Sequence, residues 1–474
     1  MFMKKVTIFV LLLIILFPTF TNFETFLGNH EVLASNDGSI KSFSTNILLS
    51  TNDSIYPQHV EPTLAIGSNN ELYVGWKEAL SPSSGGVDVS FTKSLDGGIT
   101  WTVPVTMPGY KGNDGLKSDP WLNIYNDTIY YSYLDIYNPQ SPLFYSQVTM
   151  ARSTDKGDTW LINKASENYY FADKEAFIIS SNGTIYLTYN DKLETGWINL
   201  KLSKSIDGGI TFSDVTRIND HSSQNLVGTY PAVSSNHTLC VSWLEITNSS
   251  SNFGDVYFGC SNNGGITFNS NKDLNPASDF GTFNFVGGYP EKATLPVMQF
   301  DTQDRLYILW AELNKNWKIY VKYSDDYGKH WSSKIAINDN NMVDQWQPDM
   351  AIDNNNSFHV AWFEELNNQY MPYYRTLSFS GNERSVVTKS TVLSIATNFT
   401  SSNFTRPGDY FTLRIDSDNI PHVVWTDGRS GKLDIYYASG VKNYTSTSTP
   451  GFITLFLMIT LSISVIVIKK RKKM

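Results

Sequence analysis

The chain has 474 residues, of which 14% are aromatic and only 17% are charged. This composition favours a well-packed, strand-rich protein and excludes a disordered one. The formal net charge of −9 argues against nucleic acid and anionic lipid as ligands, because both are themselves negative, and it permits cation binding.

The N-terminal segment, residues 1–34, is predicted to be a signal peptide. Lys4 and Lys5 precede an apolar run from Val6 to Phe20, which has the length of a signal-peptide core and is short for a membrane span. Cleavage is expected near Asn22 or after Ala34. The alternative is that this segment is retained as an N-terminal anchor.

The C-terminal segment is predicted to hold the protein in a membrane. Residues 441–450 form a short Ser/Thr stalk, and the uncharged run 451–468 has 18 residues, near the ~20 needed to cross a bilayer. Residues 469–474 are basic and are expected in the cytoplasm by the positive-inside rule. We therefore expect a single-pass protein of the cell membrane with its body outside. The sequence Pro450-Gly451-Phe452 before the span resembles the PGF-type sorting tails of archaeal surface proteins, which implies that the tail is exchanged for a lipid.

One octapeptide recurs five times between these ends. It reads SLDGGITW at 94–101, STDKGDTW at 153–160, SIDGGITF at 205–212, SNNGGITF at 261–268 and SDDYGKHW at 324–331. The starts are 59, 52, 56 and 63 residues apart, and a near-constant period of this length is typical of repeat architectures.

The octapeptide has the chemistry of a hairpin turn. An Asp or Asn early in a turn can accept hydrogen bonds from the backbone that follows it, and Gly supplies a backbone angle that other residues avoid. The closing Trp or Phe offers a large face for packing. We predict a structural role for the third residue of each copy: Asp96, Asp155, Asp207, Asn263 and Asp326.

A longer unit surrounds each octapeptide, with a strand that ends in an aromatic residue before the octapeptide. Seven such strands are present: 71–76, 128–133, 184–189, 238–243, 305–310, 357–362 and 422–425. The sixth unit has a degenerate turn near Ser380, and the seventh lacks its last strand, which residues 47–50 can supply. Such closure removes exposed sheet edges. We predict an all-β propeller of seven four-stranded blades over residues 35–440, with six blades as the alternative.

The repeats resemble those of the BNR/Asp-box sialidase-like superfamily, and so do the closing segments 408–411, 423–429 and 434–438. In that family the Asp box is structural. The resemblance implies exo-α-sialidase activity, with three arginines that hold the sugar carboxylate, a Tyr/Glu nucleophile pair and an Asp acid/base. It also implies that the active site lies on the face opposite the Asp boxes.

The chain departs from that family at the expected substrate site. The segment that should carry the first arginine is His59-Val60-Glu61-Pro62-Thr63, and only Arg406 and Arg429 lie in candidate loops. The family's propellers also have six blades. We therefore predict a surface propeller that recognises glycans or surface proteins without authentic sialidase activity. The alternative is a glycoside hydrolase of exo-sialidase type that acts on surface or extracellular glycans.

A carboxylate stands two positions after the aromatic residue that ends each second strand. The seven are Glu78, Asp135, Asp191, Glu245, Glu312, Glu364 and Asp427. Residues two apart in a strand share a face, so these acids are expected near the rim of the functional face. They either tie loops in place or line an acidic basin that binds Ca²⁺ or supplies an acid and a base. Asp119 and Asp173, between blades, are further candidates, and nearby aromatics such as Trp121 and Trp346 suit a sugar ligand.

Three further features fit an exported protein. Cys240 and Cys260 are compatible with a disulfide or with two buried thiols. Nine Asn-X-Ser/Thr sequons, among them Asn182 and Asn236, fit a glycoprotein. Asn-rich loops at 338–341 and 353–356 offer oxygens for Ca²⁺ but lack the spacing of a defined calcium loop.

Overall fold

A computed structural model describes residues 40–442 except 52–55, 81–85, 111–114, 138–144, 167–170, 222, 224–225, 249–252, 275–294, 338–341, 368, 381–382, 387–390, 395–396, 399–406 and 410. Residues 39–442 form one compact unit. The expected signal peptide, apolar span and basic tail lie outside the described residues. In the part that the structure describes, no helix has the length and apolar character needed to span a bilayer.

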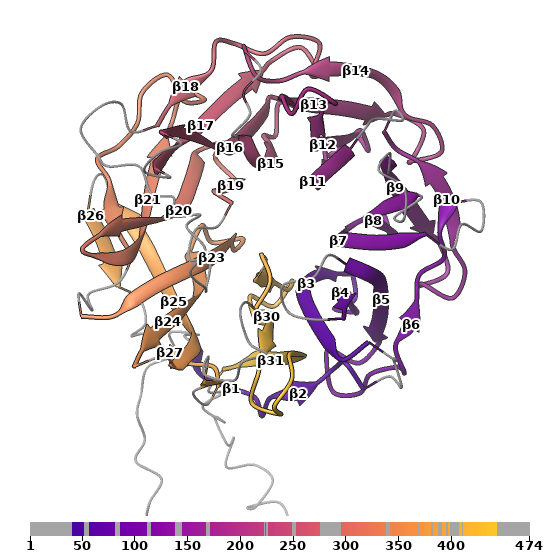
Figure 1. Ribbon diagram of the computed structural model, residues 1–474. Helices are drawn as coiled ribbons and strands as arrows, with labels where there is room; N and C mark the ends of the chain where they lie inside the picture. The colour runs from indigo at the N-terminus through magenta and orange to yellow at the C-terminus, as the bar shows by residue number, and fades with distance from the viewer. Residues whose placement is uncertain are drawn as a thin grey trace, which may run out of the picture. The chain divides into compact units, whose positions relative to one another are not determined.

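Seven antiparallel sheets form a ring, each an up-and-down sheet whose first strand lies nearest the axis (Figure 1). The first strands are β3 (Gln58–Ile66), β7 (Leu116–Tyr125), β11 (Phe171–Ile179), β15 (Leu226–Val233), β19 (Val297–Phe300), β23 (Asp344–Ile352) and β29 (Thr412–Ile415). The second strands are β4 (Leu72–Ala79), β8 (Thr128–Tyr137), β12 (Ile185–Lys192), β16 (Leu239–Asn248), β20 (Leu306–Asn314), β24 (Phe358–Leu366) and β30 (Pro421–Asp427). The prediction of a seven-bladed all-β propeller is confirmed.

The outer strands complete each blade. The third strands are β5 (Gly86–Ser94), β9 (Tyr145–Ser153), β13 (Ile198–Ser205), β17 (Phe253–Ser261), β21 (Asn316–Ser324), β25 (Gln369–Ser380) and β31 (Asp434–Lys442). The fourth strands of blades 1 to 5 are β6 (Val105–Thr106), β10 (Leu161–Lys164), β14 (Ser213–Arg217), β18 (Lys272–Asp273) and β22 (Ile335–Ala336). In blade 6 three short strands pair with β25: β26 (Glu383–Val386), β27 (Thr391–Val392) and β28 (Thr397–Asn398).

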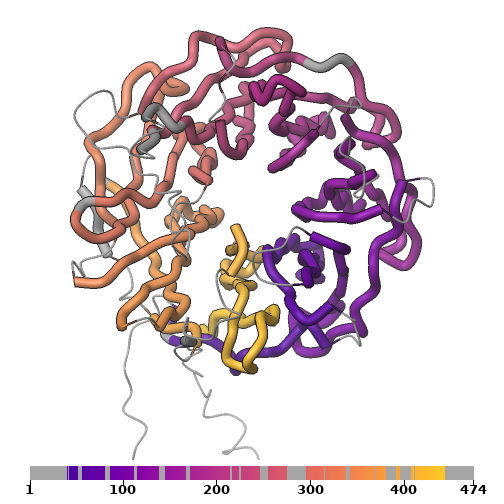
Figure 2. The backbone as a smooth tube through the Cα atoms, in the orientation of Figure 1, coloured from indigo at the N-terminus to yellow at the C-terminus, as the bar shows by residue number. Residues whose placement is uncertain are grey.

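The N-terminal part of the ring closes the last blade, as Figure 2 shows where the indigo and yellow segments meet. The strand β2 (Ile47–Leu48) pairs with β31 through Ile47 opposite Tyr437. This is the strand that the sequence predicts over 47–50. A second strand, β1 (Ile40–Phe43), also pairs with β31 and was not expected. Because both strands come from the start of the unit, the seventh sheet has no open edge along β31.

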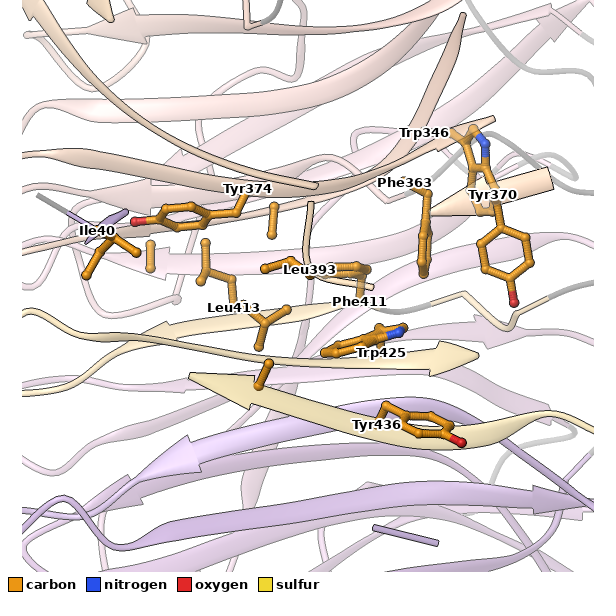
Figure 3. Close-up of a cluster of buried hydrophobic side chains, with 14 residues drawn as sticks. Ile40, Trp346, Phe363, Tyr370, Tyr374, Leu393, Phe411, Leu413, Trp425 and Tyr436 are labelled. Carbon is orange, nitrogen blue, oxygen red and sulfur yellow. The ribbon is translucent and has the colours of Figure 1, made fainter. Parts of the chain in front are cut away.

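The core lies between neighbouring blades. Between blades 6 and 7, for example, Phe363 and Phe411 meet edge to face at 4.9 Å, with Leu413 and Trp425 packed beside them (Figure 3). The aromatic residue near the end of each second strand is buried, and Trp76 and Trp425 are 0% exposed. Large buried aromatic faces of this kind dominate the energetics of packing.

Two sets of turns give the ring two distinct ends. The octapeptide turns follow the third strands, and the turns between first and second strands lie at the same end, which we call the octapeptide face. The loops between second and third strands and between blades lie at the opposite end, the loop face. The turns of the octapeptide face contact one another across blades; for instance, Asn70 Nδ2 donates to Asp418 Oδ2 at 3.1 Å.

The octapeptide turns share one hydrogen-bond pattern. In the first copy the Gly98 N–H donates to Ser94 Oγ at 2.8 Å, and the Thr100 N–H donates to Asp96 Oδ1 at 2.8 Å. The same bonds recur in the third copy, from Gly209 to Ser205 at 2.9 Å and from Thr211 to Asp207 at 2.9 Å. The carboxylate therefore serves the turn itself, which is the structural role predicted for it.

A disulfide joins the second and third strands of blade 4. Cys240 in β16 lies directly opposite Cys260 in β17, and the two are disulfide-bonded. The pair lies in the core cluster between blades 4 and 5, where Cys240 is fully buried. Its place in an antiparallel ladder explains why two cysteines 20 residues apart can meet.

Candidate functional site

Bulges interrupt the first strands at one level of the ring, nearer the loop face. The pairing register shifts between Val60 and Thr63 in β3, and between Ser118 and Trp121 in β7. Equivalent shifts occur in β11, β15 and β23. A bulge adds an unpaired residue and redirects its side chain, and bulges are frequent beside active sites.

The extra residue of each of these bulges has a positive φ. The angles are 58° at Glu61, 53° at Asp119, 51° at Lys174, 67° at Gly228 and 47° at Gln347. Only glycine adopts this conformation without strain, and strained residues of other types gather at functional sites. Four of the five are charged or amide residues, so the bulges turn polar groups toward the centre of the ring.

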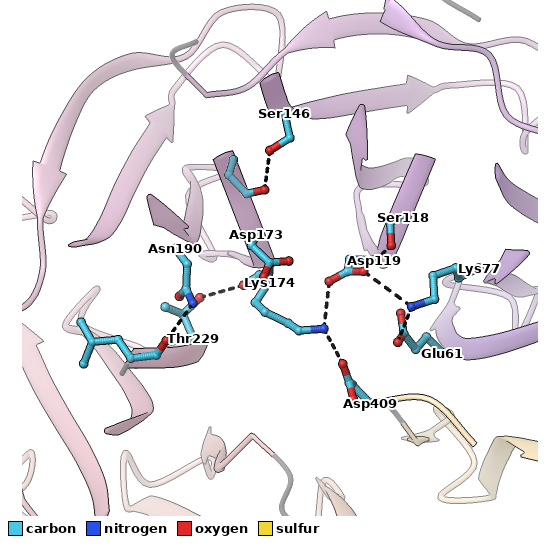
Figure 4. A network of polar contacts seen from close by, with 12 residues as sticks. Glu61, Lys77, Ser118, Asp119, Ser146, Asp173, Lys174, Asn190, Thr229 and Asp409 are labelled. Carbon is cyan, nitrogen blue, oxygen red and sulfur yellow. Dashed lines mark hydrogen bonds and ion pairs between the residues drawn. The ribbon is translucent and has the colours of Figure 1, made fainter. Parts of the chain in front are cut away.

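These residues assemble a charged network that we call the bulge cluster: Glu61, Lys77, Asp119, Lys174 and Asp409 (Figure 4). Lys77 Nζ lies 2.6 Å from Glu61 Oε1 and 3.9 Å from Asp119 Oδ1. Lys174 Nζ lies 3.1 Å from Asp119 Oδ2 and pairs also with Asp409. Blades 1, 2, 3 and 7 thus meet at two ammonium groups.

Glycine lets the network close between blades 7 and 1. Gly408, next to Asp409, has a φ of 91°, and a Cβ there would lie 2.8 Å from the backbone nitrogen of Glu61. No larger residue fits this approach without a shift of the backbone. Lys174 and Asp409 are the cluster's more accessible members, with side chains 17% and 14% exposed, whereas those of Glu61 and Asp119 are almost fully buried.

The environment separates the proton affinities of these carboxyls. Burial raises the pKa of Glu61 above its ordinary value, although Lys77 opposes the effect. Burial also disfavours ionisation of Asp119, but Lys174 and Lys77 outweigh it and hold the pKa of Asp119 below its ordinary value. Burial raises the pKa of Asp173 to about 6. Burial raises the pKa of Glu175 more strongly, and the charge of Asp119 adds to this effect.

Two buried groups beside the cluster have unused hydrogen-bonding capacity among the described residues. Both carboxyl oxygens of Glu175 lack a hydrogen-bond partner, and so does the Oε1 atom of Gln347. Buried polar groups normally have hydrogen-bond partners, so these two groups are exceptions beside the cluster.

A cavity of 390 Å³ continues along the axis from this level toward the octapeptide face. Trp121, Tyr230 and Arg414 line the part of this cavity nearer the bulges, and Ser181 and Ser235 line the part nearer the octapeptide face. Trp121 and Tyr230 meet edge to face at 5.2 Å, and Arg414 Nη1 lies 3.1 Å from Asp349 Oδ2. Trp121, Tyr230 and Arg414 also line a smaller cavity together with Asp409, which connects the aromatic pair to the bulge cluster.

The seven acids at the ends of the second strands are all buried. Six have contacts with nearby strands or loops: Glu78 accepts from Ser90, Asp135 from the Tyr110 N–H, Glu245 contacts His221, Glu312 pairs with Lys334, Glu364 accepts from Trp362, and Asp427 pairs with Arg429. The seventh, Asp191, is buried in β12. The structure does not gather them around the axis, because the first strands stand between the second strands and the channel.

The arginines in the described part of the chain do not converge on one point. Arg429 lies 2.6 Å from Asp427 and 4.2 Å over the ring of Tyr436, while Arg414 pairs with Asp349 in the channel. Arg406 lies outside the described residues. Three arginines around one sugar carboxylate, as the resemblance implies, are therefore not assembled by the described residues.

Other sequence candidates fall in different places. Asp119 belongs to the bulge cluster and Asp173 adjoins it, whereas Trp346 is 0% exposed in the core. The loop 338–341 lies outside the described residues, and Asp353 accepts hydrogen bonds from the N–H groups of its own turn. Across the described residues, no group of three or more His, Cys, Asp and Glu side chains is arranged to hold a metal ion.

Lys77, Lys174, Glu175, Asp409 and Gln347 were not predicted as site residues. The sequence does hold one signal for the bulges themselves. A polar residue followed by proline occurs inside three first strands, at Glu61, Asp119 and Gln347. Proline inside a strand indicates an edge or a bulge. The partners Lys77 and Asp409 carry no comparable signal, because only the ring brings them to the bulges.

Comparisons with known proteins give a fold and no family. No family model matches the sequence. A search of the curated proteins also finds no match. Among solved structures, an ulvan lyase bound to a GlcA–Rha3S saccharide has a TM-score of 0.52 and 13% identity over 83% of this chain and 95% of that one.

Two further structures come from glycan-active enzymes. An α-L-arabinofuranosidase of Fusarium graminearum with an iminosugar inhibitor has a TM-score of 0.50 and 12% identity over 85% of this chain and 98% of that one. A Hadza microbial sialidase has a TM-score of 0.45 and 16% identity over 65% of this chain and 63% of that one. At such identities the likeness to the ulvan lyase and the arabinofuranosidase establishes the propeller fold alone.

Proposed function

We propose that this protein is a glycan-recognising propeller of the cell surface whose ligand site is the bulge cluster. The observation that carries the proposal is the set of positive-φ bulges that turn charged residues from separate blades toward one point on the axis. Strain of this kind persists only where surrounding structure holds it, and it is typical of functional sites. The aromatic pair Trp121 and Tyr230 beneath the cluster offers a face for a sugar ring.

Recognition is favoured over sialic acid release for two reasons. The arginine that would begin a carboxylate clamp is absent from the segment 59–63, and a bidentate clamp of this kind carries much of the affinity for a carboxylate. In addition, the accessible members of the cluster are one lysine and one aspartate, Lys174 and Asp409. Such a pair can donate to and accept from sugar hydroxyls without any chemical step.

The solved structures of similar fold support a glycan ligand in general terms. Two structures with a TM-score of at least 0.5 are an ulvan lyase with a bound saccharide and an α-L-arabinofuranosidase with an iminosugar inhibitor. The position at the cell surface rests on the expected signal peptide and apolar span.

Binding to a glycan array by the full chain in detergent would test this function. We expect binding to an oligosaccharide, at least tenfold weaker in Lys174→Met than in the unaltered protein. Lys329→Met removes an exposed lysine from an octapeptide turn and is the matched control. Equal binding by both variants would place the ligand elsewhere, and no binding to any glycan would contradict the proposal.

A second candidate function is glycoside hydrolysis by Glu61 and Asp119. Lys77 Nζ contacts both groups, so Glu61 Oε1 and Asp119 Oδ1 lie at most about 6.5 Å apart, a limit compatible with the roughly 5–10 Å between glycosidase carboxyl groups. Their pKa values are also shifted in opposite directions, which suits an acid and a base. Turnover of a chromogenic glycoside that is lost in both Glu61→Gln and Asp119→Asn, with glycan binding retained, would favour this function over recognition alone.

A further inference from the structure

The octapeptide face carries exposed apolar side chains at the tips of its turns. Ile206 is 81% exposed, Ile99 78%, Ile266 66% and Leu95 53%. Isolated exposed apolar residues are common on protein surfaces, but these occupy equivalent positions of the repeat in blades 1, 3 and 4. In the second and fifth copies the corresponding residues are polar: Thr154 and Asp158 in blade 2, and Asp325 and Lys329 in blade 5.

The turns do not need apolar residues at these positions. The hydrogen bonds of the octapeptide come from its Ser, its Asp or Asn, its second Gly, its Thr and the backbone N–H of the residue at its sixth position. The side chains of Ile206 and Ile99 contribute to none of these bonds and cover no core cluster. Neither the turn nor the core therefore accounts for these exposed apolar side chains, and a surface outside the ring could cover them.

The end of β31 shows which surface lies near these side chains. Third strands run from the loop face to the octapeptide face, so β31 brings the described chain to the octapeptide face at Lys442. The Lys442 ammonium donates to the carbonyl of Asp418, which belongs to a turn of that face. The octapeptide of blade 1 is adjacent, because a Cβ at Gly98 would lie 2.2 Å from Tyr437 Oη of β31.

The distance to the expected membrane span is short. Eight residues, 443–450, separate Lys442 from the uncharged run 451–468. Even when fully extended, eight residues reach only about 28 Å. A span that begins there keeps Lys442, and with it the adjoining part of the octapeptide face, within about 28 Å of the bilayer.

We propose that the octapeptide face rests on the lipid bilayer and that the apolar tips at Leu95, Ile99, Ile206 and Ile266 enter its interfacial layer. Apolar contact, rather than charge, drives the docking, since the chain is acidic overall. Side chains of this type gain free energy when they leave water for the acyl boundary. The inference depends on the expected C-terminal span and is independent of the proposed glycan recognition.

The test uses site-specific fluorescent labels. Both native cysteines are consumed in the disulfide, so a single new cysteine can be labelled selectively. Ile99→Cys and Ile206→Cys are labelled with an environment-sensitive dye in the full chain, reconstituted into phosphatidylcholine vesicles with or without brominated acyl chains. Leu366→Cys is the matched control, because Leu366 is apolar, 54% exposed and at the end of a second strand on the loop face.

We expect brominated lipid to quench the dye at least twofold at positions 99 and 206 and to leave position 366 unchanged. The use of two tips in different blades guards against the failure of one variant to fold. Absence of quenching at both tips overturns the proposal, and so does equal quenching at position 366. A blue-shifted dye at position 99 that brominated lipid does not quench would show that a protein covers this face, which also overturns it.

Discussion

The octapeptide turns and the first-strand bulges both recur from blade to blade. They differ in what is kept: key side chains in the turns, and only the backbone conformation in the bulges. The turns keep their first Ser, their fifth-position Gly and their bonds: the Gly98 N–H donates to Ser94, and the Gly328 N–H donates to Ser324 in the same manner. The bulges keep their backbone angle, with φ near 50° at both Asp119 and Gln347, but their side chains differ. A repeat element with constant residues serves the fold, whereas one with a constant backbone and variable side chains can carry a specific site.

The contrast extends to hydrogen bonding. The octapeptide carboxylates are fully used by their own turns, and the pKa of Asp207 falls to about 2 although burial opposes it, because Thr211 and Ser205 donate to the carboxylate. Beside the bulges, the buried Glu175 has two oxygens without partners among the described residues. The octapeptide carboxylates therefore have their hydrogen bonds within their own turns, whereas a buried carboxyl at the bulges has none among the described residues.

The largest expected effect on the free energy of unfolding comes from a glycine beside the bulge cluster, compared with a glycine of an octapeptide turn. Gly408→Ala places a Cβ against the Glu61 backbone at a φ of 91°, so we expect a loss of about 3 kcal/mol in the free energy of unfolding. Gly97→Ala has a similar φ of 71° but no atom within 4 Å of the new Cβ, so a loss of about 1 kcal/mol is expected. Urea denaturation of both variants measures the difference. Equal losses would mean that blades 7 and 1 are not in the tight contact described.

Removal of a cluster ammonium should have the next largest effect. Lys174→Met leaves the buried Asp119 with less compensation, and we expect a loss of about 2 kcal/mol at pH 7 because the remaining charge is partly shielded by Lys77. The pKa of Asp119 lies below its ordinary 3.8, so the ion pair stabilises above that value and is lost as the pH falls through the folded-state pKa. The difference between the two proteins should therefore shrink below pH 4. A loss that does not change between pH 7 and pH 3 would show that packing, not charge, is responsible.

Neutralisation of the partnerless carboxyl should increase stability. The pKa of Glu175 is raised above its ordinary 4.5, so ionisation of this group costs stability as the pH rises above that value. Glu175→Gln removes the cost, and we expect a gain of about 1 kcal/mol at pH 8 and none at pH 4. Thermal unfolding across this pH range measures it. A loss at pH 8 would mean that the carboxylate has a partner, such as a bound cation or ligand.

The repeat allowed the fold to be predicted closely, because the octapeptide and the aromatic-ended strands each occur once per blade. Even the closing strand at 47–48 follows from the seventh unit's missing strand. The strand β1 was missed because residues 40–43 have no equivalent in any other unit.

The candidate site was predicted only in part. Asp119 and Glu61 could be singled out because each precedes a proline, and Asp173 lies beside Lys174. Lys77 and Asp409 were missed, since they belong to different blades and meet the bulges only after the ring closes. The seven acids were predicted because one recurs in every unit, and such regularity is expected of a structural contact, as between Glu312 and Trp310 at 3.2 Å.

The smallest expected effect tests whether the octapeptide turns need a charge. In the fourth copy an amide replaces the carboxylate: Asn263 Oδ1 accepts from the Thr267 N–H at 3.1 Å, and Asn263 Nδ2 donates to the Thr267 hydroxyl at 2.8 Å. Asp207→Asn can form the same bonds, so we expect a change below about 0.5 kcal/mol at pH 7. The pKa of Asp207, about 2, is below its ordinary 3.8, so its contribution fades as the pH falls toward 2, and the variant should lose this dependence. Asp207→Ala removes the acceptor and should cost about 1–2 kcal/mol. If Asn and Ala at this position cost the same at pH 7, the carboxylate's charge matters, and the octapeptide turns cannot be regarded as interchangeable structural elements.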